Sequence, residues 1–269
     1  MKWIAYALIA LLLSPLVVTI LVSFTPSRYL ELLRGEWTFE WYRQFAADPV
    51  WGDALQNSLV TAALTAALSV TIALATGMAL VRHRFRWKGA WEAALLLPMV
   101  LPGVALATGM LAVVRATPLG GSQLSLALAH SIRAIPVAYL VIRASLQQVD
   151  SNLEAAARGL GAGPWQVFRF VTLPLVMPAV LAATLFALVI SLNEITLTLF
   201  LATRYTETLP RVIWPNLRFA ITPLVAAASV ILLALTLPAL VTADGGCVPG
   251  AAIDSRTYQR HLISTKPVA

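Results

Sequence analysis

Long apolar runs separated by short polar segments dominate this 269-residue chain. A helix needs about 20 mostly apolar residues to cross the ~30 Å hydrocarbon core of a bilayer. Six runs approach this length: Trp3–Phe24, Ser58–Val81, Ala93–Val114, Leu124–Ile142, Leu173–Ala202 and Pro223–Ala243. The fifth is long enough to be tilted or broken. The pattern therefore predicts an all-α, polytopic membrane protein with six transmembrane helices.

The distribution of Lys and Arg predicts the orientation of these helices, because cytoplasmic loops carry the excess of positive charge. If the N-terminus lies in the cytoplasm, eleven of the nineteen basic residues fall inside and six fall in the outer loops. The strongest anchor is RHRFRWK at residues 82–88. We therefore expect both termini to be cytoplasmic. The first run exceeds the usual ~7–15-residue core of a secretory signal, so we expect it to be retained.

Composition excludes several classes of protein. Only 12% of the residues are charged and the mean hydropathy is +0.81, which leaves too little polar surface to coat a soluble domain. The net charge of +7 resides mostly at the ends of apolar runs rather than on a water-facing patch, so we expect no nucleic-acid partner. A single cysteine, Cys247, permits neither an internal disulfide framework nor a cysteine cluster for a metal.

The chain divides into three parts. Residues 1–51 hold the first transmembrane helix and an extracytoplasmic loop, and residues 52–243 hold five further helices. A polar tail at 244–269 has no periodic apolar face and is predicted to be disordered. The aromatic stretch WTFEWYRQF in the outer loop is typical of a membrane-surface belt.

Residues 143–172 form a cytoplasmic loop that predicts two short helices. Asp150, Ser151 or Asn152 can cap the first, and Glu154 and Arg158 stand one turn apart as an i,i+4 pair. Gly161 ends this helix, and Gly163-Pro164 begins a second that carries Trp165. Small alanines on one face and nearby aromatic residues suit docking on another protein, or else lying on the lipid surface.

This loop resembles the signature of the transmembrane subunits of binding-protein-dependent ABC importers of the type I fold. That signature reads E-A-A, three residues, G, nine residues, I, one residue, L-P. It falls on Ala155, Ala156 and Ala157, then Gly161, Val171 and Leu173-Pro174. The signature glutamate is replaced by Ala155, and the nearby acid is Glu154, about 100° round the helix.

The resemblance implies a non-catalytic permease subunit in a bacterial inner membrane. It implies two ATP-binding cassette ATPase subunits on the coupling loop, a second permease subunit, more often a sister chain than a copy, and an extracytoplasmic solute-binding protein. ATP and Mg would bind to the ATPase partners, so no cofactor or metal is expected in this chain. The phosphate-binding pattern GxxxxGK[ST] is absent from the sequence.

Polar residues inside the predicted helices are candidates for a substrate path, because burying them in lipid is costly. The fifth run contains Ser191, Asn193 and Glu194, and the fourth contains Arg133, which can pair with Glu194. Glu194 either lines a path that attracts cations or is a hydrogen-bonded interface residue. Pro136 favours a kink or break in the fourth helix, and Pro98, Pro102 and Gly103 favour a bend in the third.

The segment SLNEITLTLF resembles the permeases of the polyamine importer group, which implies a small polar solute such as a polyamine or a related amino compound. Polyamine members often have two adjacent acids where this chain has Asn193-Glu194. Two rival functions remain open. One is an ion- or proton-coupled carrier or channel without an ATPase. The other is a membrane enzyme, although the intramembrane polar residues include no HExxH or paired-Asp arrangement.

Overall fold

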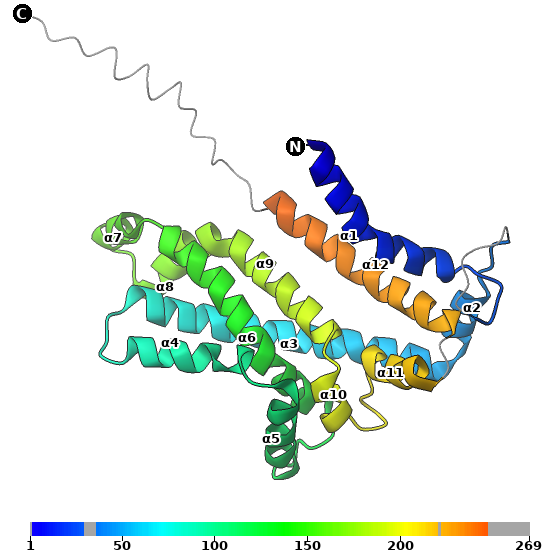
Figure 1. Ribbon diagram of the computed structural model, residues 1–269. Helices are drawn as coiled ribbons and strands as arrows, with labels where there is room; N and C mark the ends of the chain where they lie inside the picture. Colours follow the sequence, from blue (N-terminus) through cyan, green and yellow to red (C-terminus); the bar gives the residue numbers. More distant parts are fainter. Residues whose placement is uncertain (1, 30–35, 220–221, 247–269) are drawn as a thin grey trace, which may run out of the picture.

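The computed structural model describes residues 2–29, 36–219 and 222–246, and all regular elements in those ranges are helical. Three long helices form the centre and lie side by side (Figure 1): α3 (Pro49–Arg82), α6 (Gln123–Gln148) and α9 (Leu173–Leu192). Six further helices of the described ranges lie around them: α1 (Lys2–Val22), α4 (Lys88–Leu96), α5 (Gly103–Arg115), α10 (Thr196–Leu201), α11 (Leu209–Phe219) and α12 (Pro223–Gly246). Short helices α2 (Glu40–Ala47), α7 (Ser151–Gly159) and α8 (Pro164–Val167) lie at the two ends of the bundle.

Small side chains let the three central helices approach closely. Buried alanines recur along each of them, for example Ala73 on α3, Ala138 on α6 and Ala183 on α9. A Cβ added to Gly77 of α3 would lie 3.1 Å from Leu146 Cδ1 of α6, so a larger residue at that crossing would require the Leu146 side chain to shift. Lipid tails are as apolar as leucine, so association depends on such close packing rather than on escape from water.

Local capping explains where the central helices begin. The Asp48 side chain accepts a hydrogen bond from Val50 N and Pro49 takes the first helical position of α3. Ser122 caps α6 by accepting from Ser125 N. These signals are readable in the sequence because each acts over only two or three residues.

The helix lengths reduce the predicted number of complete spans. Three helical stretches are long and apolar enough to cross a membrane: Pro49–Arg82, Gln123–Gln148 and Pro164–Leu192. A fourth span is reached if the bent pair Lys88–Met99 and Gly103–Arg115 counts as one. The first and last predicted spans correspond to shorter apolar helices, Tyr6–Val22 and Pro223–Thr236. Within the described residues, the count of six is therefore not reached by length and composition alone.

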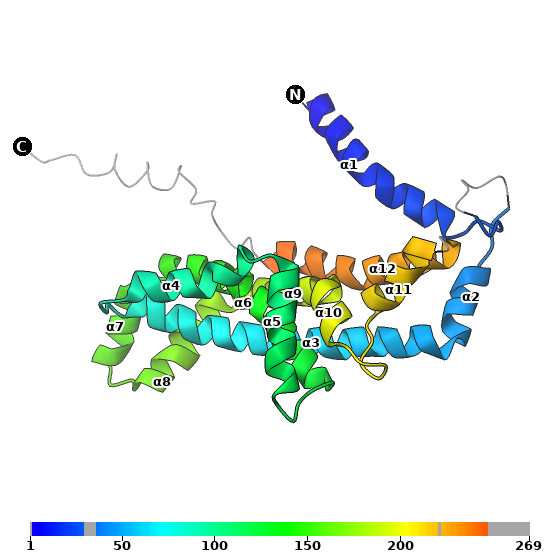
Figure 2. The same ribbon diagram turned by 60° about the horizontal axis from the view of Figure 1, so that its bottom comes forward.

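The third and fifth predicted runs are broken, and the fourth is a single helix. The third run turns by 103° after the 3₁₀ turn Leu97–Met99, and α5 then lies across the bundle (Figure 2). The fifth run breaks at residues 193–195, between α9 and α10. Both features were predicted. Of the kink or break predicted for the fourth run, the break is absent, because α6 continues through Pro136 as one helix; the kink stays a prediction.

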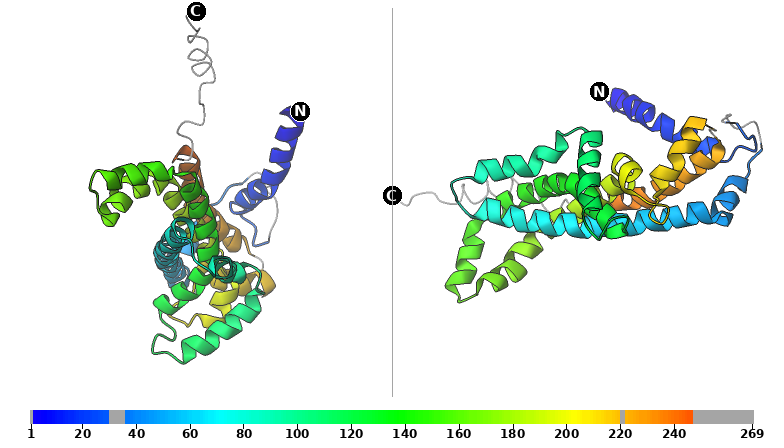
Figure 3. Two further views of the ribbon diagram at one scale, coloured as in Figure 1. Left: turned by 90° about the vertical axis from the view of Figure 1, so that its left-hand side faces the viewer. Right: turned by 90° about the horizontal axis from the view of Figure 1, so that it is seen from below.

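The two ends of the bundle differ. At one end, α7 and α8 form a V that projects from the bundle (Figure 3). At the other end, α2 lies beside an aromatic cluster in which the Phe24 ring contacts those of Trp37, Phe39 and Tyr42. This cluster matches the aromatic stretch noted in the sequence. The predicted disordered tail lies outside the described residues from position 247 onward.

Candidate functional site

An ion pair lies where the two broken helices meet. Arg133 Nη1 of α6 lies 3.2 Å from Glu194 Oε2, in the break between α9 and α10. A Cβ added to Gly103, the first residue of α5, would lie 3.3 Å from the same Arg133 nitrogen. Glycine at this position therefore lets the start of α5 approach the pair. The pairing that the sequence allowed between Arg133 and Glu194 is present in the structure.

The Glu194 carboxylate also organises the break. It is buried, and its Oε1 accepts a hydrogen bond from Leu197 N in the first turn of α10. Thr198 Oγ1 donates to the Glu194 carbonyl oxygen at 2.8 Å. Arg133 balances the carboxylate charge, and the Arg133 side chain is 39% exposed. The guanidinium is therefore the more accessible member of the pair.

A chain of polar side chains extends from this break into the centre of the bundle. His130 is fully buried, with Nδ1 2.9 Å from Ser191 Oγ and Nε2 3.1 Å from Thr198 Oγ1. Ser191 Oγ donates to Thr65 Oγ1 of α3 at 3.3 Å. The chain thus joins α3, α6, α9 and α10. Thr65 was missed in the sequence because a lone threonine in an apolar helix carries no distinguishing signal.

Asn193 lies apart from this network. Its side chain is exposed and donates to the Val189 carbonyl oxygen at 2.8 Å. It lines a cavity of about 320 Å³ with residues of α1 and α12, including Thr19 and Ser229. The structure therefore brings together Ser191, Glu194 and Arg133, and places the fourth candidate for the substrate path on a different face.

The loop between α6 and α9 has the predicted local structure. Asp150 caps α7 by accepting from Asn152 N at 2.9 Å. Gly161 follows α7 with φ +90°, a conformation that favours glycine. Gly163 is the N-cap of α8, and its N–H donates to Gln166 Oε1 at 2.8 Å. The two glycines and Pro164 thus set the angle of the V.

The V and the turn that follows it carry several large apolar side chains that are exposed within the described residues. Leu160 is 91% exposed, Phe170 70% and Trp165 66%. Ala155 and Ala156 are exposed on the same loop. Large exposed apolar side chains gathered on a projecting loop are typical of a surface that another molecule covers.

Glu154 faces the bundle. Its Oε1 lies 2.9 Å from Arg82 Nη2 at the end of α3 and accepts a hydrogen bond from Thr172 Oγ1 at 2.8 Å. The predicted partner, Arg158, is more distant, with 3.9 Å between Arg158 Nη2 and Glu154 Oε2. The carboxylate is buried, so it holds α7 against α3 and the start of α9. We refer to Glu154, Arg82 and Thr172 as the loop anchor.

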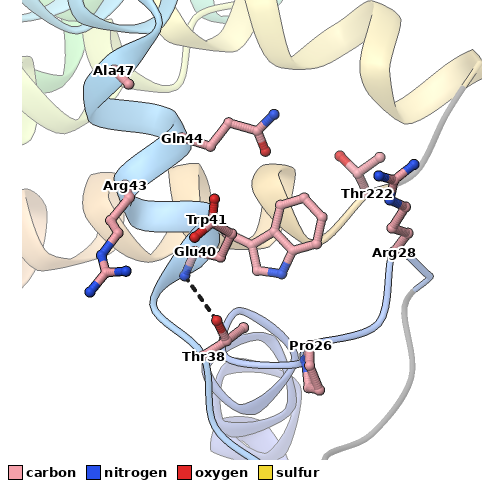
Figure 4. A pocket seen from close by; sticks show the side chains of 9 residues that line it. All are labelled: Pro26, Arg28, Thr38, Glu40, Trp41, Arg43, Gln44, Ala47 and Thr222. Atoms are coloured by element: carbon pink, nitrogen blue, oxygen red, sulfur yellow. Dashed lines mark hydrogen bonds between the residues drawn. The ribbon is translucent and has the colours of Figure 1, made fainter.

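A polar cavity of about 830 Å³ lies at the opposite end of the bundle (Figure 4). Its walls come from the loop after α1, from α2 and from Thr222 before α12, with Arg28, Trp41 and Gln44 around it. Trp41 is fixed by a hydrogen bond from Nε1 to the Thr25 carbonyl oxygen at 2.7 Å. Among the described residues, no group of three or more His, Cys, Asp and Glu side chains is placed to hold a metal ion.

The sequence matches the family model of the binding-protein-dependent transport system inner membrane component over residues 69–244. Among curated proteins, it is 28% identical over 229 residues to the putrescine transport system permease protein PotI of Escherichia coli K12, covering 82% of this chain and 81% of that one. It is also 28% identical over 238 residues to the spermidine/putrescine transport system permease protein PotC of the same strain, covering 88% and 90%.

The fold is similar to that of a solved bacterial alginate ABC transporter in complex with an alginate pentasaccharide-bound periplasmic protein. The TM-score is 0.69 at 15% sequence identity, and the match covers 90% of this chain and 93% of that one. A second structure of an alginate-importing ABC transporter matches with a TM-score of 0.66.

We expect Arg133 and Glu194 to be energetically coupled. In a double-mutant cycle of Arg133→Gln and Glu194→Gln, the coupling free energy of unfolding should be about 1–2 kcal/mol, because Arg133→Gln leaves the buried Glu194 carboxylate without its partner, whereas Glu194→Gln leaves a partly exposed cation. Thermal unfolding of the four proteins in detergent measures it. The cycle of Arg211→Gln with Glu207→Gln is a control on a pair 3.4 Å apart and partly exposed on both sides, with an expected coupling below ~1 kcal/mol. Strictly additive effects at Arg133 and Glu194 would contradict the expectation.

The loop anchor should protect the V from proteolysis. Glu154→Gln removes the charge that pairs with Arg82, so α7 should open more often and trypsin should cleave after Arg158 at least roughly tenfold faster. Asp150→Asn is the matched control, because it removes one negative charge from the same loop while asparagine remains a good N-cap. Equal cleavage rates in the two variants would show that Glu154 does not hold the loop.

Proposed function

The chain belongs to the family of binding-protein-dependent transport system inner membrane components, and on that premise we propose that it forms part of the path for a small polar solute in an ATP-binding cassette importer. The observation that carries the proposal is the V of α7 and α8. It projects from the bundle, exposes several large apolar side chains and is anchored to the bundle by Glu154. These are the properties needed to receive force from a partner and pass it on.

The partners that would grip this surface are two ATPase subunits. They would bind ATP and Mg, and this chain would be non-catalytic. Leu160, Trp165 and Phe170 offer the apolar area, and the exposed alanines of α7 allow close approach of a partner helix. Because Ala155 replaces the signature glutamate and Glu154 is buried in the loop anchor, binding would depend on shape and apolar contact rather than on a charge at that position.

Movement of the V would reach the solute path through two connections. The Arg82–Glu154 ion pair ties α7 to α3, and Thr172 ties it to the start of α9. At its far end α9 breaks next to Arg133 and Glu194. When the ATPase pair closes, a displacement of the V would therefore tilt α3 and α9 together and change the shape of the break. This is alternating access driven by ATP hydrolysis in the partner.

The solute would be a small organic compound with an amino group. The names of PotI and PotC support a polyamine. The Arg133–Glu194 pair has no net charge, and its partly exposed member is the guanidinium, which can contact an acidic group of a solute. An amino compound that also carries an acidic group is therefore the alternative to a polyamine.

The importer would span the bacterial inner membrane with both chain termini in the cytoplasm, as the Lys and Arg distribution predicts. A sister permease subunit would complete the path, and a solute-binding protein would dock at the end that carries α2. The rival function is an ion- or proton-coupled carrier without an ATPase. Co-purification separates the two, because an importer subunit retains ATPase chains in mild detergent and a lone carrier does not.

Gly161→Ala should weaken recovery of the ATPase subunits. A side chain at φ +90° costs roughly 1–2 kcal/mol, so the V would change its angle and present a different face. We expect at least a fivefold loss of co-purified ATPase with normal membrane insertion. Gly159→Ala is the matched control, because Gly159 is helical and a Cβ there meets nothing within 4 Å. Full recovery with Gly161→Ala would contradict the docking role of the loop.

A further inference from the structure

A second surface, at the Arg82 end of α3 and separate from the break between α9 and α10, has no assigned role. A groove of about 410 Å³ lies between α3 and α4 next to the turn that joins them. Leu80 and Ala79 of α3 form one wall, Trp91 and Leu95 of α4 form the other, and Phe85 of the turn closes the end. The lining is almost entirely apolar. Such a lining offers few hydrogen-bond partners to a polar solute and suits a hydrocarbon chain.

The turn at the mouth of this groove carries unbalanced positive charge. Residues 82–88 include four permanent cations, of which Arg82 is paired with Glu154. Arg84, Arg86 and Lys88 have no acidic partner among the described residues, and Arg86 lies 6.0 Å from the centre of the Trp87 ring. The nearest acid along the chain, Glu92, is engaged by Arg143 and Tyr139. The mouth of an apolar groove thus has a net charge of about +3 from these side chains.

We propose that this groove binds an anionic phospholipid. One acyl chain would lie between α3 and α4, and the phosphate would be held by Arg84, Arg86 and Lys88. The inference rests on the orientation given under the proposed function, which places residues 82–88 at the cytoplasmic surface. Clusters of Lys and Arg at that surface attract anionic headgroups, and basic pockets between helices there bind them specifically.

Two further features favour a lipid as the occupant. Trp87 and Trp91 are largely exposed beside the groove, and tryptophan is enriched at the level of the headgroups. Among the lining residues, Leu80 is buried in the core cluster that includes Ile142 of α6, whereas Phe85 and Trp91 are exposed, so the groove is accessible from outside the bundle on the side of the turn and of α4. The combination of an apolar slot, interfacial tryptophans and excess cations is complementary to each part of an anionic lipid. An uncharged lipid would satisfy only the first two.

The site adjoins the loop anchor. Arg82 is the last residue of α3 and begins the turn that carries the three free cations, while its guanidinium holds Glu154. A lipid phosphate bound to this turn would fix the same end of α3 to which the V is tied. The lipid would therefore stabilise the V in the position that it has in this structure.

Tryptophan quenching by brominated lipids tests the proposal. The full-length protein is placed in mixed micelles with brominated phosphatidylglycerol or brominated phosphatidylcholine, and the difference between wild type and Trp91→Phe isolates Trp91 from the eight tryptophans. We expect Trp91 to be quenched at a several-fold lower mole fraction of phosphatidylglycerol than of phosphatidylcholine. High salt should reduce this preference.

The triple variant Arg84→Gln, Arg86→Gln, Lys88→Gln should abolish the several-fold preference for phosphatidylglycerol, because each cation near an anionic headgroup can contribute up to about fivefold. Arg28→Gln, Arg43→Gln, Arg204→Gln is the matched control, because it removes three cations from the outer end and should leave the preference unchanged. Ala94→Phe, which fills the groove, should reduce quenching by both lipids. If the triple variant fails to fold, Ala94→Phe and the salt series still decide the question.

Equal quenching by the two lipids, or an unchanged preference in the triple variant, would overturn the proposal. Loss of quenching when the ATPase subunits bind would assign the groove to a protein partner and would also overturn it. The result is separable from the proposed function. Selective quenching in a chain that retains no ATPase would support the lipid site and refute the importer role, and the reverse result would do the opposite.

Discussion

The bundle depends on one constraint: backbone groups freed at a helix break must find partners when no water is available. Two of the apolar runs break, at residues 100–102 and 193–195, and the helices that follow start close together, since a Cβ on Gly103 would lie 3.4 Å from Thr196 Cγ2. At the second break, side chains satisfy the freed backbone groups: the Glu194 carboxylate accepts from Leu197 N, and Thr198 Oγ1 donates to the Glu194 carbonyl oxygen. Burying that carboxylate then requires Arg133. Breaks inside a membrane are tolerated only where polar groups line them, so the breaks and the polar network are one feature.

The second organising contact lies at the end of α3. Arg82, Glu154 and Thr172 connect the projecting V to two of the three central helices. The V can therefore expose large apolar side chains and still be held in one position. The same turn carries the cations that we assign to a lipid headgroup. The proposals for ATPase coupling and lipid binding thus meet at one helix end, although they use different side chains.

Much of the local structure could be predicted from the sequence, and much of the site could not. Caps and glycines act within a few residues, so the V of α7 and α8 was readable in its main elements, including Asp150, Gly161 and Gly163. The ion-pair partner of Glu154 could not be predicted in this way. An i,i+4 neighbour, Arg158, was available in the sequence, but Arg82 lies much closer in space because α3 ends beside α7. Similarly, Asn193 and Glu194 are adjacent in the chain but face opposite surroundings at the break.

The order of apolar and polar residues was enough to predict a helical membrane protein and its candidate polar residues, since hydropathy and capping are properties of short segments. The family was indicated by the motif at residues 155–174, which is also a local pattern. Tertiary packing decided the rest. It determined that α6 passes Pro136 without a break, that α5 turns across the bundle, and that Thr65 joins the polar network. These outcomes depend on which helix lies next to which, and contacts between distant segments are set by how small side chains pack across helices rather than by any local pattern.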